Sequence, residues 1–265
     1  MIVMTNILGC RPAPRRPAGS TLWASIDVEW TKNYRIKNGN VPFCLSVVYV
    51  AVPDAGAVID PSGLPFAYTS LYVENADETP ALITAADEAV RVAVRVADRI
   101  TGHQLSSDLS VLTNASTAPL TAVTAAREAW QERKGYTLAD RRILDTRYDA
   151  GHILTGHSRR LVDVCTDLGL DVTQPELLRT SMTALHRAYL ATGSTEARER
   201  ISVLNIRHSL STALVALRAT GQASWSGTLN VNRLLAAELD DSIGWLAHPT
   251  FTALLGEPCL SATVS

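Results

Sequence analysis

The sequence predicts an α/β domain built around a mixed β-sheet. Strand-like segments come first, at residues 22–26, 41–52 and 66–73, and helical and strand-like segments alternate after them. Apolar residues make up 46% of the chain and charged residues 19%, a composition that supports a buried core. With 265 residues, the chain fits one large domain, or one domain with tails.

The first part of the chain is typical of an antiparallel meander. Residues 22–26 are apolar and are followed directly by acidic residues. Residues 41–52 are rich in β-branched and aromatic side chains, as expected of a buried strand. Residues 53–65 are dense in turn formers, and 66–73 again has a strand-like composition.

Helical patterns dominate the rest of the chain. A proline at the start and apolar residues near helical spacing predict a helix over residues 80–100. Residues 106–112 resemble a capped helix, with serine at the cap and aspartate in the first turn. Residues 141–148 are consistent with a strand. Further helices are predicted at residues 121–135, 158–170, 174–192, 195–220 and 231–239.

Charge and cysteine content limit the function classes. The net charge of −2 means that nucleic-acid contact would depend on a local basic patch. No apolar run is long enough to span a bilayer, so we expect a cytoplasmic protein without membrane partners. The cysteines are far apart and lack CxxC spacing, which favours reduced thiols over a zinc site or disulfides: Cys10, Cys44, Cys165 and Cys259.

Asp27 and Glu29 end the first predicted strand. Residues two apart in a strand face the same side, so these carboxylates point together. Like charges held that close favour a cation between them, and oxygen ligands suit Mg²⁺ or Mn²⁺. By itself an Asp-x-Glu pair is a weak signal and favours two solvated carboxylates at a strand end.

Residues 100–112, ITGHQLSSDLSVL, add a third acidic residue, Asp108, within the first turn of a helix. With the Asp-x-Glu strand, this segment resembles the DEDD superfamily of 3′–5′ exonucleases. That family has a strand ending in Asp-x-Glu, then a Gly-His-Asn-like turn that leads to an aspartate. This chain departs from the pattern at Gln104, where asparagine is usual, and at Ser107, where an aromatic residue is common.

The resemblance implies a ribonuclease H-like fold, with a mixed five-stranded sheet in the order 3-2-1-4-5 flanked by helices. It covers roughly residues 22–220, so we expect an exonuclease-like domain over 21–220 and a helical C-terminal extension over 221–265. The proline and arginine content of the first residues predicts a disordered N-terminal arm over 1–20. Two later segments also resemble the family, ILDTRYDAGHIL (143–154) and HSRRLVDVCTDLGLDV (157–172). Their aspartates, Asp145, Asp163 and Asp167, are interpreted as ordinary solvated groups at strand and helix ends.

This chain differs most from the family at the last motif. Aligned through Thr212, the final helix places His208 where the family has its fourth metal-binding aspartate. The positions of the family's general base hold Val203 and Leu204, which cannot transfer a proton. Two explanations stay open. His208 completes the metal shell as a neutral imidazole, which favours Mn²⁺ over Mg²⁺, or the site has decayed.

The other histidines and the arginines are assigned simpler roles. We expect His103 to form the turn and His152, His157, His186 and His248 to be surface or core residues. Arginines cluster in the arm and between the second and last motifs, where they form either a solvated face or phosphate contacts beside the site. They are Arg11, Arg15, Arg16, Arg141, Arg142, Arg147, Arg159 and Arg160.

The resemblance therefore implies a metal-dependent 3′–5′ exonuclease that hydrolyses phosphodiester bonds of DNA or RNA. Asp27, Glu29, Asp108 and His208 would hold Mg²⁺ or Mn²⁺, in a two-metal site. The partner would be single-stranded or 3′-ended nucleic acid. The alternative is a weakly active or inactive exonuclease-like module that binds nucleic acid, a protein partner or a second copy of itself. A third alternative is an unrelated α/β binding protein.

Overall fold

The computed structural model describes residues 1–265 except 10, 32–36, 38, 55–56, 240–242 and 257–265. Its main sheet contains six strands: β1 (Ile2–Thr5), β2 (Ser20–Thr31), β3 (Val41–Pro53), β4 (Phe66–Tyr72), β5 (Arg99–Gly102) and β6 (Ile143–Asp145). Their order across the sheet is β1-β4-β3-β2-β5-β6. β2, β3 and β4 pair antiparallel, while β5 runs parallel to β2 and β6 runs parallel to β5. The chain is thus an α/β protein with a mixed sheet.

The sheet differs from the expected five strands by one edge strand. Residues 2–5, within the arm expected to be disordered, pair antiparallel with β4 from Ile2 opposite Tyr72 to Thr5 opposite Thr69. The amino group of Met1 also lies 2.6 Å from a carboxylate oxygen of Glu74. The backbone of β4 has an open edge, and a short β-branched segment such as IVMT satisfies its hydrogen-bonding groups.

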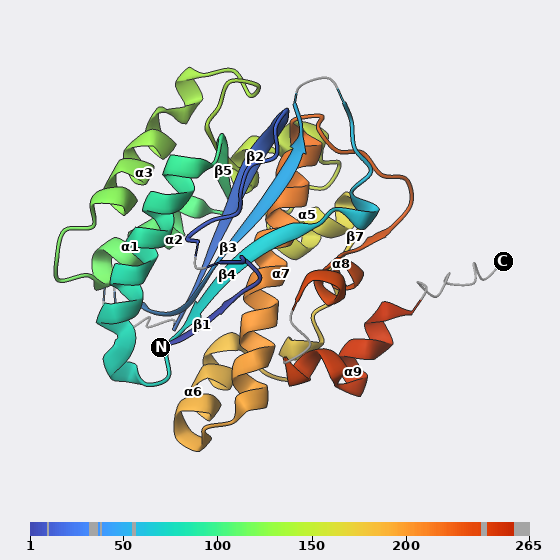
Figure 1. The fold of residues 1–265 in the computed structure, drawn as a ribbon. Coiled ribbons are helices and arrows are strands. Elements are labelled where there is room, and N and C mark those ends of the chain that lie inside the picture. The colour runs from blue at the N-terminus through green and yellow to red at the C-terminus, as the bar shows by residue number, and fades with distance from the viewer. Residues whose placement is uncertain (10, 32–36, 38, 55–56, 240–242, 257–265) are drawn as a thin grey trace.

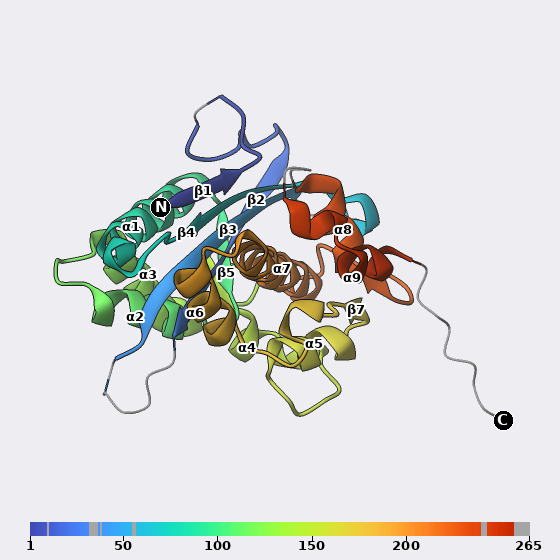
Figure 2. The same ribbon diagram turned by 90° about the horizontal axis from the view of Figure 1, so that it is seen from below.

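Helices cover both faces of the sheet (Figures 1 and 2). On one face lie α1 (Thr79–Val96), α2 (Leu105–Ala115) and α3 (Thr121–Glu132). On the other face lies α7 (Thr195–Ala219), with α4 (Thr146–Asp149), α5 (Leu161–Asp167) and α8 (Val231–Glu238) around it. α6 (Met182–Thr192) packs along α7, and α9 (Pro249–Thr252) follows near the C-terminus.

The alternation of side chains along β2 separates the two cores. Leu22 and Ile26 belong to the apolar cluster beneath α1–α3. Trp23 belongs to the cluster around α7. Because odd-numbered residues of β2 face α7, the side chains of Asp27 and Glu29 also point toward that helix.

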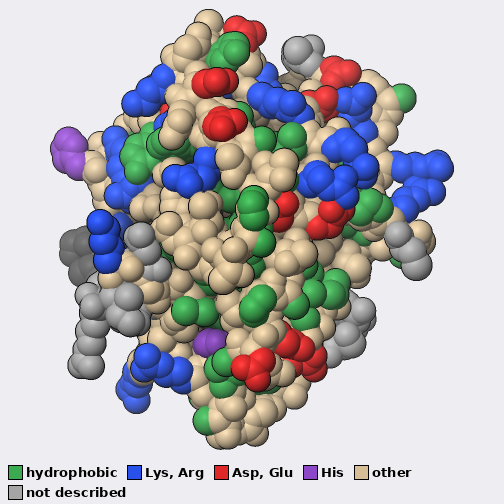
Figure 3. All heavy atoms as spheres, turned by 90° about the vertical axis from the view of Figure 1, so that its left-hand side faces the viewer, with side chains coloured by type: hydrophobic (Ala, Val, Ile, Leu, Met, Phe, Trp, Pro, Cys, Tyr) green, Lys and Arg blue, Asp and Glu red, His purple; other side chains and the backbone are tan. Residues whose placement is uncertain are grey.

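The outer surface of the α1–α3 layer is charged with both signs. Figure 3 shows Lys and Arg side chains mixed with Asp and Glu in the upper part of this face, and acidic side chains gathered near its lower edge. Arg91 is paired with Glu88 on α1 at 2.5 Å. This face is therefore a solvated helical surface and not a uniformly basic one.

Several element boundaries differ from those expected. The helix expected over residues 80–100 ends at Val96, and β5 begins at Arg99. α2 begins at Leu105 and its N-cap is Gln104, not a serine. The helix expected over 158–170 is only Leu161–Asp167, and 174–192 contains a short 3₁₀ turn before α6.

Beyond residue 220, a two-stranded sheet joins β7 (Leu170–Asp171) to β8 (Leu229–Asn230), and α8 packs against α7. Cys44 and Cys165 are free and buried, whereas Cys10 and Cys259 fall outside the described residues. In the part of the chain that the structure describes, no helix is both long and apolar enough to cross a membrane.

Candidate functional site

Asp27 and Glu29 lie near the C-terminal end of β2, on the face that α7 covers. Their side chains are 14% and 17% exposed, so solvent reaches them only in part. β2 is paired with β3 on one edge throughout this stretch, with Asp27 opposite Ser46 and Glu29 opposite Cys44. The sheet thus fixes both carboxylates on one side, at the spacing that the strand period requires.

His208 reaches the two carboxylates from α7. Its Nδ1 lies 3.0 Å from Oε1 of Glu29 and 3.6 Å from Oδ2 of Asp27. One ligand atom from each of the three residues lies within 4.8 Å of the others, so they could hold a single metal ion. The helix and the strand bring together residues that are 179 positions apart in the sequence.

Asp108 lies beside this cluster, although it is not one of the three residues within 4.8 Å. Its side chain is in the first turn of α2 and is almost fully buried, and the nearby backbone N–H of Val28 opposes the rise in its pKa. That N–H is available because β5 pairs with β2 only from Trp23 to Ser25. Asp108 therefore approaches the cluster along the uncovered edge of β2.

The carboxylate of Asp108 is poorly satisfied. Its Oδ2 is buried and accepts no hydrogen bond from the residues that the structure describes. Burial raises the pKa of Asp108 well above its ordinary value, and the negative charges of Asp27 and Glu29 raise it further. Burial likewise raises the pKa of Glu29, against the opposing effect of His208. A cation among these groups would offset both effects.

The protonation of His208 depends on its carboxylate neighbours. Burial by itself would lower the pKa of the imidazole, but the hydrogen bonds and charges of Asp27 and Glu29 outweigh it and raise that pKa to about 10. The ring therefore carries a proton on both nitrogens at neutral pH. Its Nε2 lies 3.0 Å from the side-chain amide of Gln174, which must present its carbonyl oxygen to a protonated ring and its NH₂ group to a neutral one.

Asn205 is a site residue that sequence reasoning missed. It lies one helical turn before His208 on α7, and its Nδ2 donates to Oδ2 of Asp27 at 2.6 Å. Its Oδ1 accepts a hydrogen bond from the thiol of Cys44 at 3.4 Å, which fixes the orientation of the amide. The signal available in the sequence was the spacing, since residues three apart on a helix share a face. Gln174 carried no comparable signal.

The interpretation of Asp145 as a solvated group was wrong, because its side chain is fully buried. Its carboxylate accepts hydrogen bonds from the backbone N–H of Gln104 at 2.9 Å and from the indole N–H of Trp130 at 2.8 Å. By contrast, Asp163 is 43% exposed and accepts a bond from Ser158. Asp167 accepts bonds from the exposed residues Thr155 and Gly156.

His103 is in the turn between β5 and α2, as expected of a turn residue. Its Nδ1 lies 2.9 Å from the Thr146 hydroxyl, and its Nε2 lies 2.9 Å from the backbone oxygen of Arg159. Burial lowers the pKa of His103 to about 4, so the ring is neutral at pH 7. The positions of the family's general base, Val203 and Leu204, are fully buried in the apolar cores.

The basic residues separate into two groups. Arg147 and Arg159 lie close to His103, and each donates to backbone oxygen atoms: Arg147 to Arg159 at 2.9 Å, and Arg159 to Gly156 at 2.8 Å. Arg160 is 80% exposed. This group lies beside the candidate site, and some of its guanidinium N–H groups donate to backbone oxygen atoms of the same segment.

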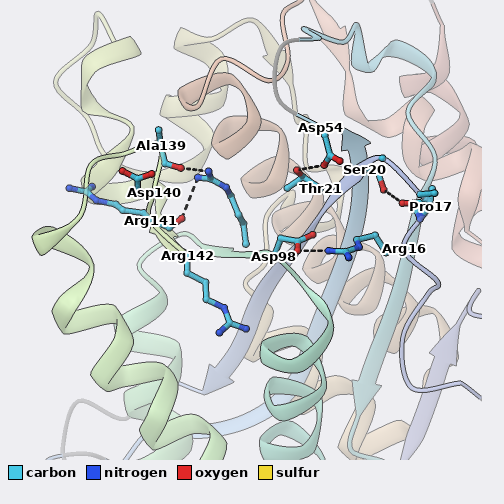
Figure 4. Close-up of a pocket in the computed structure, with 13 residues that line it drawn as sticks. Arg16, Pro17, Ser20, Thr21, Asp54, Asp98, Ala139, Asp140, Arg141 and Arg142 are labelled. Atoms are coloured by element: carbon cyan, nitrogen blue, oxygen red, sulfur yellow. Dashed lines mark hydrogen bonds and ion pairs between the residues drawn. The ribbon is translucent and has the colours of Figure 1, made fainter.

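The second basic group lines a pocket of about 680 Å³ at the opposite end of the sheet (Figure 4). Arg16 pairs with Asp98 at 2.5 Å, and Arg141 pairs with Asp149 at 2.9 Å. The pocket adjoins Thr21, about 20 Å along β2 from Asp27 at the rise of an extended strand. It therefore does not belong to the carboxylate cluster.

No protein-family model matches this chain. No curated protein is significantly similar to it in sequence.

Proposed function

We propose that this chain is a metal-dependent 3′–5′ exonuclease with a ribonuclease H-like fold, acting on phosphodiester bonds of DNA or RNA. The observation that carries the proposal is the meeting of Asp27, Glu29 and His208, whose ligand atoms lie within 4.8 Å of one another. Asp108, whose buried Oδ2 has no hydrogen-bond donor among the described residues, lies beside them. Three carboxylates crowded into a half-buried site are costly without a cation.

The topology of the sheet supports the fold part of the proposal. Counted from β2 along the chain, the five strands β2, β3, β4, β5 and β6 are arranged in the order 3-2-1-4-5, and β1 extends the sheet at the β4 edge. The first three are antiparallel, and β5 and β6 run parallel to the first of them. The site is at the C-terminal end of the central strand, where ligands bind in open α/β sheets.

The residues present fit a divalent cation. Asp27, Glu29 and Asp108 supply hard oxygen ligands, which suit Mg²⁺, and the imidazole of His208 shifts the preference toward Mn²⁺. Divalent cations held by these residues would supply an activated water and charge stabilisation at a phosphodiester bond. The chain itself orients one of the ligands, because the amide of Asn205 donates a hydrogen bond to Asp27.

Among the residues that the structure describes, the positions of the family's general base hold no side chain that can accept a proton. Val203 and Leu204 are buried and apolar, and His103 is engaged at both nitrogens. Proton removal from the attacking water would therefore depend on the bound cations, and we expect slow turnover. The substrate would be a single strand or a free 3′ end, with Arg147, Arg159 and Arg160 placed for phosphate contact.

The second candidate is an exonuclease-like module that binds nucleic acid or a protein without cutting it. The state of His208 favours this alternative, because a protonated imidazole between Glu29 and Asp27 compensates their charge without a metal. Metal binding must then displace that proton, which weakens the affinity.

Degradation of an end-labelled oligonucleotide separates the two candidates. With Mn²⁺, wild-type protein should shorten a 5′-labelled single strand one nucleotide at a time, and Asp27→Asn should not. Asp163→Asn, which removes an exposed carboxylate that is not part of the cluster, is the matched control and should retain activity. Binding of the strand by wild type without shortening, in Mn²⁺ or Mg²⁺, would favour the inactive module.

A further inference from the structure

The turn that leads into α2 is tightly built. Gly102 ends β5, and a Cβ there would lie 2.9 Å from Cβ of Leu105 and 3.1 Å from the backbone oxygen of Ile26. Gln104, two residues later, has a φ of 66°, in the left-handed region that side chains other than glycine rarely adopt. Asp108 is four residues beyond Gln104, so the direction of its side chain depends on this turn.

Asp145, the last residue of β6, and Thr146, the next residue, both contact the His103–Gln104 turn. β6 pairs parallel with β5, which places Asp145 opposite Gly102. Oδ1 of Asp145 accepts the backbone N–H of Gln104 at 2.9 Å. The hydroxyl of Thr146 lies 2.9 Å from Nδ1 of His103.

Asp145 is itself held from two directions. The indole N–H of Trp130 donates to its Oδ2 at 2.8 Å, and the backbone N–H of Arg147 donates to its Oδ1 at 3.2 Å. The side chains of Asp145 and Thr146 are both fully buried. With these bonds made, the Asp145 carboxylate has a donor on each oxygen, unlike Asp108, whose Oδ2 has none within the described ranges of the chain. Asp145 therefore fits a role as a brace and not as a metal ligand.

We infer that Asp145 and Thr146 are positioning residues that hold the His103–Gln104 turn and thereby place Asp108 at the metal cluster. The inference rests on the proposed function to the extent that it is tested by Mn²⁺ affinity. It assigns a purpose to the Asp-Thr pair at the end of β6 and to the left-handed Gln104. Outer groups that orient a ligand typically change metal affinity by about 10–100-fold when they are lost.

The test measures Mn²⁺ affinity from the electron paramagnetic resonance of free Mn²⁺. Asp145→Asn keeps the size of the side chain but replaces one acceptor oxygen with an NH₂ group, and should weaken binding by about 10–100-fold. Thr146→Val should produce a smaller loss and serves as a second variant if Asp145→Asn does not fold. Asp163→Asn, a charge-matched surface variant, should bind as wild type does.

Two further variants distinguish positioning from general destabilisation. In an Asp108→Asn background, Asp145→Asn should have little additional effect on Mn²⁺ affinity, because the ligand that it positions is already lost. Gln104→Gly should recover part of the affinity of Asp145→Asn, since glycine adopts the left-handed turn without the brace. Full additivity of Asp145→Asn with Asp108→Asn would overturn the inference, even if both variants fold.

Hydrogen exchange at the Gln104 amide gives a readout that needs no metal. Exchange at this amide should be at least about tenfold faster in Asp145→Asn than in wild type, because its acceptor is altered. An unchanged exchange rate would show that Asp145 does not hold the Gln104 turn. If wild type and Asp27→Asn bind Mn²⁺ equally, the proposed function is wrong and the exchange result alone decides whether the brace exists. If Asp108→Asn weakens Mn²⁺ binding but Asp145→Asn does not, the inference is wrong and the proposed function stands.

Discussion

The side-chain amide of Asn205 lies 2.6 Å from the carboxylate of Asp27 and joins α7 to β2 at the centre of the candidate site. His208, one turn further along α7, makes its shorter contact with Glu29, at 3.0 Å. The helix thus offers a separate nitrogen to each carboxylate of the Asp-x-Glu pair.

Replacement of Asn205 tests how crowded the carboxylates are. Asn205→Ala should lower the free energy of unfolding by about 1–3 kcal/mol, because it leaves Asp27 without a buried donor. Asn205→Asp should lower it further in EDTA, since a second carboxylate would face Asp27, and Mn²⁺ should recover part of that loss. Urea denaturation with and without Mn²⁺ measures both effects. Equal stability of the two variants in EDTA would contradict the prediction.

Metal binding should stabilise the protein through the cluster. Mn²⁺ or Mg²⁺ should raise the melting temperature, with a gain of about 2.7 kcal/mol when the ion is at 100 times its Kd. Asp27→Asn should abolish the rise, because it removes one ligand charge. Thermal melts of wild type, Asp27→Asn and the control Asp163→Asn provide the comparison. The same rise in wild type and Asp27→Asn would mean that the metal binds elsewhere.

Substitution of His208 tests the residue that departs from the family pattern. His208→Ala should weaken metal binding and lower any nuclease activity, whereas His208→Asp should retain activity and shift it toward Mg²⁺, because a carboxylate is a harder ligand than imidazole. Cleavage rates of a labelled strand in each ion measure the shift. If the domain has decayed, wild type should be inactive in both ions. Fast Mg²⁺-supported cleavage by His208→Ala would show that this position does not touch the chemistry.

The pH dependence of stability tests the protonation of His208. Its pKa is about 10 in the folded protein and near 6.5 in the unfolded chain, so the folded state binds the extra proton between these values. The resulting stabilisation is fully present below pH 6.5 and is lost as pH rises toward 10. In EDTA, the free energy of unfolding should therefore fall by up to about 2 kcal/mol from pH 6.5 to 8.5.

His208→Gln is the control for that pH dependence. Glutamine does not titrate, so the difference between the variant and wild type should shrink as pH rises through this range. Urea denaturation at several pH values gives the comparison. Parallel curves for the two proteins would show that His208 is not protonated in the folded state.

The sequence by itself determined the main elements and the three residues that meet at the site. Alternation along residues 22–29 placed Asp27 and Glu29 on one face, whereas His208, on the helix predicted over 195–220, was selected by the resemblance to the family's last motif. These signals survive because a strand or a helix repeats locally, and its period can be counted in the chain. The capped segment likewise placed Asp108 in a first helical turn, as in α2.

Only the tertiary structure decided how the remaining groups serve that site. Asp145 follows an apolar strand in the sequence, a position typical of a solvated residue. The parallel pairing of β6 with β5 instead buries it against the Gln104 turn. The edge strand β1 forms because β4 leaves its backbone groups open. Gln174 reaches His208 across a gap of 34 residues. Contacts of this kind depend on which strands and helices become neighbours, and no local period in the sequence encodes that choice.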